Sequence, residues 1–226
     1  MQEKAKIYAK IRRGTSYKLA PAGTLILSAI FTALSSIITA QSIGTFHFGG
    51  NMSRFIGEDA KYGIENMFDF KFGYQVGFTQ TFGDFYQFEP GVFLINKGAR
   101  YEKDFIEAVK TVFNLNYLQL PVNFKVNFKI GNLCLVGGLG VYAGLGLWGN
   151  VLSDGKYNHI EFFSKKDPYR ALDFGGQILV GAKYSRVGAC LGWQSGFTNI
   201  SKDRKINNSS FTLNLSYVII SRCRDI

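Results

Sequence analysis

The chain contains few residues whose types and spacing could carry out chemistry. Its 226 residues include two histidines, His47 and His159. His159 follows Ser153 and Asp154 and precedes Glu161, so a Ser/His/acid hydrolase is one candidate. No spacing brings a nucleophile within hydrogen-bonding reach of the base, and polar loops of this composition are usually only solvated. We therefore expect no catalytic residue and no enzyme.

The three cysteines, Cys134, Cys190 and Cys223, do not show the paired spacings of a small disulfide-stabilised domain. No cluster of cysteine and histidine has metal-ligand spacing either. The sequence therefore predicts no metal site and no cofactor.

The elements that must position these residues are strands. In "FDFKFGYQVGFTQ" (Phe68–Gln80), every even position from 68 to 78 is apolar, and every odd position from 69 to 79 is polar or glycine. This period of two predicts a strand with an apolar face and a polar face.

The same alternation recurs along the chain after residue 41, where no amphipathic helix of convincing length is found. We expect eight strands, an even number, around Ile43–Ser53, Phe68–Thr81, Phe85–Asn96, Tyr117–Lys129, Leu133–Leu147, Phe174–Tyr184, Val187–Gln194 and Phe211–Tyr217.

The expected connections alternate in length. Short turns fall at 82–84, 130–132 and 185–186, and long connections fall at roughly 54–67, 97–114, 150–170 and 199–209. Short turns on one rim and long loops on the other are typical of an outer-membrane barrel. The segment "YEKDFIEAVKTVF" in the second long connection fits either a short helix or an extension of the fourth strand.

The apolar faces decide between a soluble barrel and a membrane barrel. A soluble barrel of lipocalin type points its apolar face inward, whereas a bilayer requires apolar side chains outside and a closed sheet without free edges. The polar face here is rich in glycine, which suits the narrow interior of a small barrel. The sequence predicts an all-β fold, an eight-stranded antiparallel up-and-down transmembrane β-barrel. It places Phe70, Phe72, Phe124, Leu139 and Leu213 against lipid.

The predicted inner face carries a few charges of mixed sign. We expect an interior polar network of Asp69, Lys71, Glu89, Lys125, Asp173 and Lys183. Such charges could line an aqueous channel, but eight strands enclose space that side chains fill, which favours a plug of ion pairs. His47 also faces inward, where a hydrogen-bonded structural histidine is the preferred interpretation. Cys134 and Cys190 face inward with one strand between them, about 9–10 Å apart, so we expect free thiols.

The basic residues of the chain do not form a nucleic-acid surface. The formal net charge is +10, of which residues 1–40 contribute +5 and the remaining residues +5, without a long basic run. We therefore expect no nucleic-acid partner. The third and fourth long loops gather Lys165, Lys166, Arg170, Lys202, Arg204 and Lys205, which could contact lipopolysaccharide phosphates or simply keep the loops soluble.

The first forty residues have the features of an export leader. A basic region up to Lys18 precedes the uncharged stretch Leu19–Ala40, and the small residue Ala40 offers a cleavage point before Gln41. The alternative is an uncleaved transmembrane anchor, because 22 uncharged residues can span a bilayer. We expect a signal peptide over residues 1–40 and a β-barrel domain over residues 41–226.

Three segments in the expected order carry a resemblance to a known family. "FEPGVFLINKGA" (Phe88–Ala99), "NYLQLPVNFK" (Asn116–Lys125) and "GWQSGFTNIS" (Gly192–Ser201) are similar to strand motifs of the small outer-membrane β-barrels of Bacteroidetes, often called PorT-like. "ITAQ" (Ile38–Gln41) resembles the leader end usual in that phylum. Two features depart from the family pattern: Gln119 stands where a carboxylate is common, and the chain ends in "YVIISRCRDI" without a terminal aromatic residue.

The resemblance implies a location in the bacterial outer membrane, with the N-terminus and short turns in the periplasm and the long loops outside. It implies little about activity, because members include secretion-system components. We expect a non-enzymatic barrel that assists an envelope machine for secretion or outer-membrane protein assembly through its loops and rims. It would contact outer-membrane lipid and a protein partner. The alternatives are a stand-alone structural barrel or narrow porin and, third, an outer-membrane lipid-modifying hydrolase.

Overall fold

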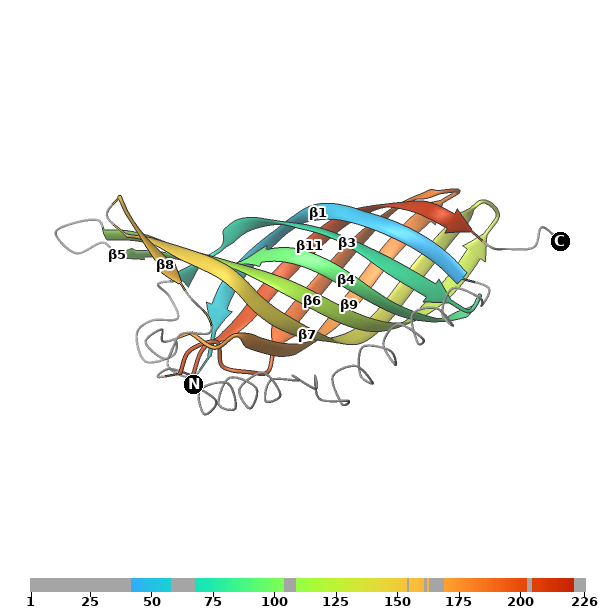
Figure 1. The fold of residues 1–226 in the computed structure, drawn as a ribbon. Coiled ribbons are helices and arrows are strands. Elements are labelled where there is room, and N and C mark those ends of the chain that lie inside the picture. The colour runs from blue at the N-terminus through green and yellow to red at the C-terminus, as the bar shows by residue number, and fades with distance from the viewer. Residues whose placement is uncertain are drawn as a thin grey trace, which may run out of the picture. The chain divides into compact units, whose positions relative to one another are not determined.

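The computed structural model describes residues 42–57, 68–103, 109–153, 155–160, 162, 169–202 and 205–221. Eight long strands form a closed ring of antiparallel neighbours (Figure 1). In ring order they are β1 (Ser42–Ile56), β3 (Lys71–Phe82), β4 (Tyr86–Lys97), β6 (Val109–Ile130), β7 (Leu133–Ser153), β9 (Leu172–Tyr184), β10 (Val187–Gly196) and β11 (Asn207–Ser221). Pairing of β11 with β1 closes the ring, so the predicted eight-stranded antiparallel barrel is confirmed.

The three short turns lie where the sequence places them. They connect β3 to β4, β6 to β7, and β9 to β10, all at one end of the barrel. Gly83 and Gly131 adopt positive φ angles of 94° and 60°, and Ser185 adopts 53°. A Cβ at position 83 would lie 2.1 Å from the Tyr86 carbonyl oxygen, so this turn requires glycine.

At the opposite end, two strands extend beyond the others. β6 and β7 have 22 and 21 residues and project at the left of Figure 1, where β5 (Arg100–Lys103) pairs with β6 and β8 (Lys156–Ile160) pairs with β7. The two-residue strand β2 (Phe68–Asp69) pairs with β5. In the second long connection, the strand alternative is therefore right for the described residues, and residues 104–108 lie outside them.

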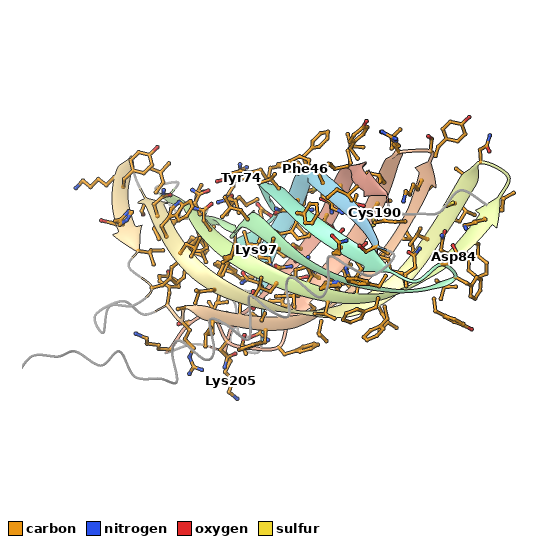
Figure 2. The ribbon with its side chains drawn as sticks, turned by 45° about the vertical axis from the view of Figure 1, so that its right-hand side comes forward. Phe46, Tyr74, Asp84, Lys97, Cys190 and Lys205 are labelled. Carbon is orange, nitrogen blue, oxygen red and sulfur yellow. The ribbon has the colours of Figure 1, made fainter. Side chains whose placement is uncertain are left out.

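The alternating faces point as expected for a membrane barrel. On β3, the Phe72 side chain is 74% exposed, whereas Lys71 and Gln75 are buried. On β7, Leu139 is 64% exposed, whereas Tyr142 is buried. Figure 2 shows Phe46 and Tyr74 on the outside of the wall and Lys97 within it. Because apolar side chains cover the outer face, the barrel is the inverse of a soluble one.

Apolar side chains also fill the interior near the long loops. We call the buried residues Phe55, Ile95, Ala99, Leu115, Tyr117, Ile160, Phe162, Ile200 and Ile206 the loop-end cluster. Phe55, Ile95, Leu115 and Tyr117 lie on strands of the ring, Ile160 is the last residue of β8, and the others lie in connections between strands. The described residues contain no helix that is long and apolar enough to cross a membrane. The predicted leader, residues 1–40, lies outside the described part of the chain.

Candidate binding site inside the barrel

The interior is organised in layers, and the layer nearest the long loops, next to the loop-end cluster, contains an ion pair. Lys97 Nζ lies 3.5 Å from Asp173 Oδ2, and both side chains are 1% exposed. The same ammonium group lies 4.2 Å from the centre of the Tyr142 ring, and Asn208 donates a 3.0 Å hydrogen bond to Asp173. A buried charge pair of this kind is tolerated because each ion has a partner and further polar contacts. The layer therefore holds the loop end of the barrel together.

A layer of amide side chains follows below the ion pair. We call Gln75, Gln119, Asn123, Gln177, Gln194 and Asn214 the amide layer. Gln75 donates to Asn214 (2.6 Å), Gln194 donates to Gln177 (2.8 Å), and Gln177 donates to Asn123 (2.5 Å). A Cβ at Gly140 on β7 would come within 2.3 Å of Asn123 Oδ1, so glycine on this strand leaves room for the amides of its neighbour. The layer links β3 with β11 and β6 with β9 and β10.

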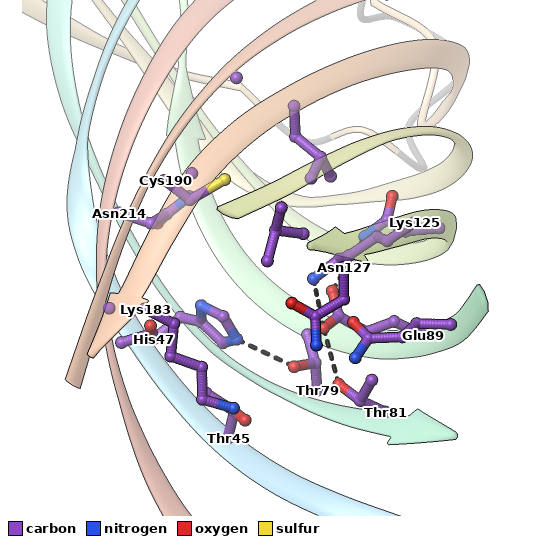
Figure 3. A pocket seen from close by; sticks show the side chains of 18 of the residues that line it. Thr45, His47, Thr79, Thr81, Glu89, Lys125, Asn127, Lys183, Cys190 and Asn214 are labelled. Carbon is purple, nitrogen blue, oxygen red and sulfur yellow. Dashed lines mark hydrogen bonds and ion pairs between the residues drawn. The ribbon is translucent and has the colours of Figure 1, made fainter. Parts of the chain in front are cut away.

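Between the amide layer and the short turns the barrel encloses a cavity of about 980 Å³, which we call the vestibule (Figure 3). Its lining includes Gly83, Asp84, Asn132 and Ser185, which belong to all three short turns. The vestibule therefore opens at the short-turn end, and its other end is bounded by the amide layer.

One wall of the vestibule carries an ion pair and a histidine in a hydrogen-bonded cluster. Lys125 forms an ion pair with Glu89, which also accepts hydrogen bonds from Thr81 (2.8 Å) and Asn123 (3.3 Å). His47 Nε2 shares a 2.9 Å hydrogen bond with Thr79 Oγ1, as Figure 3 shows. These groups come from β1, β3, β4 and β6. His47 is thus a hydrogen-bonded interior histidine.

The opposite wall of the vestibule is formed partly by glycines, which leave the space inside the barrel unfilled. Gly181 on β9 and Gly188 and Gly192 on β10 line it and contribute no side chains. An eight-stranded barrel is normally just wide enough for side chains to fill it. Glycines on one side facing long polar side chains on the other therefore leave a one-sided void.

The structure brings only some residues of the predicted interior network together. Glu89 and Lys125 pair in the vestibule, and Lys183 also lines it. Asp173 lies in the ion-pair layer, and buried Lys71 bonds to Asn96 near the long loops. The prediction for Asp69 is wrong, because this residue is exposed on β2.

Asp69 does not belong to the interior network because the predicted strand is interrupted between Asp69 and Lys71. The alternation of Phe68–Gln80 runs through Phe70 in sequence, but the ladder breaks there and β2 pairs with β5 outside the ring. Phe70 is half-buried, with the Arg54 guanidinium 4.9 Å from its ring centre. Hydrophobic periodicity continues across such a break, so the sequence pattern did not reveal it.

Sequence reasoning missed Lys97, the partner of Asp173. The sequence pattern places this residue in a long connection, whereas β4 continues to Lys97. The signal was present: Gln87, Glu89 and Gly91 face inward, and the same parity continued along the strand reaches Lys97.

The remaining candidates lie apart from the vestibule or contribute only thiols to it. His159 lies on exposed β8 opposite Asn150, whereas Ser153 lies opposite Lys156 and shares a 3.1 Å hydrogen bond with Thr111. Ser153 and His159 are therefore three ladder positions apart, about 10 Å. Cys134 and Cys190 are free and line the vestibule, and Cys223 lies outside the described residues. Within the part of the chain that the structure describes, no group of three Cys, His, Asp or Glu residues is placed to hold a metal ion.

The basic loop residues are partly described. Arg170, Lys202 and Lys205 are exposed, and Lys165, Lys166 and Arg204 lie outside the described residues. The third and fourth long loops are joined, because the Arg170 amide donates to the Ile200 carbonyl (2.8 Å) and Tyr169 bridges to Ser201. This contact brings Arg170 and Lys202 to the same part of the loop end. Lys205, which follows on the fourth long loop, is labelled in Figure 2.

Three solved structures are similar to this chain at low sequence identity. Neisserial surface protein A is 11% identical with a TM-score of 0.43, over 77% of this chain and 96% of that one. The attachment invasion locus protein Ail of Yersinia pestis is 10% identical with a TM-score of 0.41, over 80% and 100%. The N-terminal β-barrel domain of Pseudomonas aeruginosa OprF is 9% identical with a TM-score of 0.34, over 79% and 98%.

A sequence search of characterised proteins gives no significant match. The family profile described as "Outer membrane protein beta-barrel domain" matches residues 40–219, which is most of the chain. Together with the inverted, closed sheet, this match identifies the chain as a bacterial outer-membrane protein that belongs to the outer membrane protein β-barrel domain family.

Proposed function

We propose that this barrel is a non-enzymatic docking component of an envelope machine for secretion or outer-membrane protein assembly. The observation that carries the proposal is the loop end, where β6 and β7 project with β5 and β8 beside them. Tyr157 on β8 is 74% exposed there, and an exposed aromatic side chain suits a protein interface. The projecting strands offer a partner a hydrogen-bonded surface beyond the barrel ring.

The same end supports a contact with lipid headgroups. Exposed Arg170 and Lys202 lie on joined loops, and the sequence adds Lys165, Lys166, Arg204 and Lys205 nearby. Guanidinium and ammonium groups bind phosphate oxygens strongly. We propose that these residues contact lipopolysaccharide phosphates and orient the barrel, with its short turns in the periplasm and its long loops outside. The PorT-like resemblance of its strand motifs is consistent with this placement.

A narrow porin is the less favoured alternative. Any solute would have to cross the amide layer, the Lys97–Asp173 pair and the loop-end cluster in succession. A hydrolase is less favoured still, because Ser153 bonds to Thr111 and lies about 10 Å along the ladder from His159.

Co-purification in mild detergent tests the docking proposal. The expected result is one stoichiometric partner. Its recovery should fall when Tyr157 and Arg170 are replaced by serine, and should persist in a matched variant that replaces Tyr184, an exposed tyrosine at the short-turn end. Substitutions are preferable to deletion of the third loop, because Ile160 and Phe162 belong to the loop-end cluster.

Two outcomes would contradict the proposal. Absence of any reproducible partner would favour a stand-alone barrel. Normal partner recovery combined with a hydrolytic activity that is abolished by His159→Ala would replace docking with the enzyme interpretation.

A further inference from the structure

The vestibule is space inside the barrel that its side chains do not fill, whereas side chains normally fill an eight-stranded barrel. Along β10 it extends from Gly188 to Gln194, about 15 Å along the barrel axis at a rise of ~3.3 Å per residue and a tilt of ~40°. It is open at the short turns and bounded by the amide layer at its other end. A ligand must therefore enter lengthwise through the short-turn rim, which favours an elongated chain.

The lining selects against several elongated ligands. Its two carboxylates, Asp84 and Glu89, nearly balance its three lysines, Lys125, Lys129 and Lys183, so a polyanion has little advantage. Asp84 and Glu89 are paired with Lys129 (2.6 Å) and Lys125. An acyl chain has no hydrogen-bond donors, so it would exclude water from the polar groups of the lining without giving them new partners, which is unfavourable.

The polar groups of the vestibule match a peptide backbone. Gln119 Oε1 at its inner end and Asn127 Oδ1 nearer its mouth are buried acceptors without a hydrogen-bond partner among the described residues. Buried acceptors are normally satisfied, so a donor must come from water or from a ligand. Peptide N–H groups spaced along an extended chain would reach acceptors at both depths. Phe93, Pro121 and Val136 add apolar contacts for side chains.

We infer that the vestibule receives an extended, nearly uncharged peptide segment of a partner protein from the short-turn side. About five residues in extended conformation would span its depth. The inference rests on the proposed docking function, and it adds a second contact to that function at the end of the barrel opposite the projecting strands. The segment binds in the barrel and is not transported, because the amide layer and the loop-end cluster lie beyond it.

Photo-crosslinking in cells that produce the full chain tests the inference. The probe is a benzophenone amino acid placed at Val136 or Cys190, which line the vestibule. Leu135 and Leu191, the neighbouring outward-facing residues on the same strands, serve as matched controls. The expected result is crosslinks from both vestibule positions to one short contiguous stretch of one protein, identified by mass spectrometry, and none from the control positions.

A blocking variant separates occupancy from chance proximity. The double variant Cys134→Trp/Gly188→Trp should abolish the Val136 crosslink by obstructing the vestibule with two large side chains, whereas the outward-facing pair Leu135→Trp/Leu191→Trp should leave it intact, provided both variants show the heat-dependent gel shift of a folded barrel. Crosslinks only to lipid or glycan, or no crosslink at all from folded protein, would overturn the inference. If a partner still co-purifies in that case, the docking function stands without the vestibule; if none does, both proposals fail.

Discussion

At the scale of single residues, the most consequential interaction is the buried pair of Lys97 and Asp173. Asn208 and the Tyr142 ring complete its surroundings. Removing one member of a buried pair leaves the other ion without compensation, at a cost of roughly 3–5 kcal/mol. The pair therefore fixes how the loop end of the interior is packed.

Lys97→Met should reduce the free energy of unfolding in phospholipid vesicles, measured by urea titration, by roughly 3–5 kcal/mol. The double variant Lys97→Met/Asp173→Asn should recover part of this loss, because no lone charge remains. Lys129→Met is the matched control: its exposed pair with Asp84 is expected to contribute at most about 1 kcal/mol. Equal effects of Lys97→Met and Lys129→Met would contradict a buried, coupled pair.

At the scale of elements, strand number, turn positions and the orientation of each face were predictable from period two. The set of residues that form the loop-end cluster was not predictable from the sequence. Phe162, Ile200 and Ile206 lie in connections without alternation, and they meet Phe55 only because the ring closes. Contacts between residues so far apart in sequence leave no local periodic signal. The vestibule depends on β9 and β10 glycines facing the charged wall across the barrel, a relation that no single strand contains.

The exposed apolar face of β7 gives a prediction at the same scale. Leu139 pairs with Phe124 and Ile178 near the middle of the sheet and is 64% exposed. In a membrane barrel, Leu139→Arg should lower the free energy of unfolding in vesicles by roughly 2–4 kcal/mol.

Tyr157→Arg on the projecting strand β8 is the control and should change stability little, because this exposed side chain lies beyond the barrel ring. A harmless Leu139→Arg would mean that this face meets water.

At the scale of the whole molecule, the barrel is asymmetric along its axis. One end is filled by the loop-end cluster and the Lys97–Asp173 pair, and the other holds an open vestibule. Purified protein in planar bilayers should therefore show no stable conductance. Reproducible ion-selective steps from pure protein would require a continuous path through the amide layer and would favour the porin interpretation.

Thiol labelling of Cys190 shows most directly from which side of the membrane the vestibule can be reached. A variant retaining Cys190 alone, with Cys134→Ser and Cys223→Ser, should remain unlabelled in intact cells by a charged maleimide dye too large to pass general porins. After permeabilisation of the outer membrane the same thiol should react. A second variant with Tyr157→Cys in the same background should label in intact cells. Labelling of Cys190 in intact cells would contradict an interior that is closed at the loop end and open only at the short-turn end.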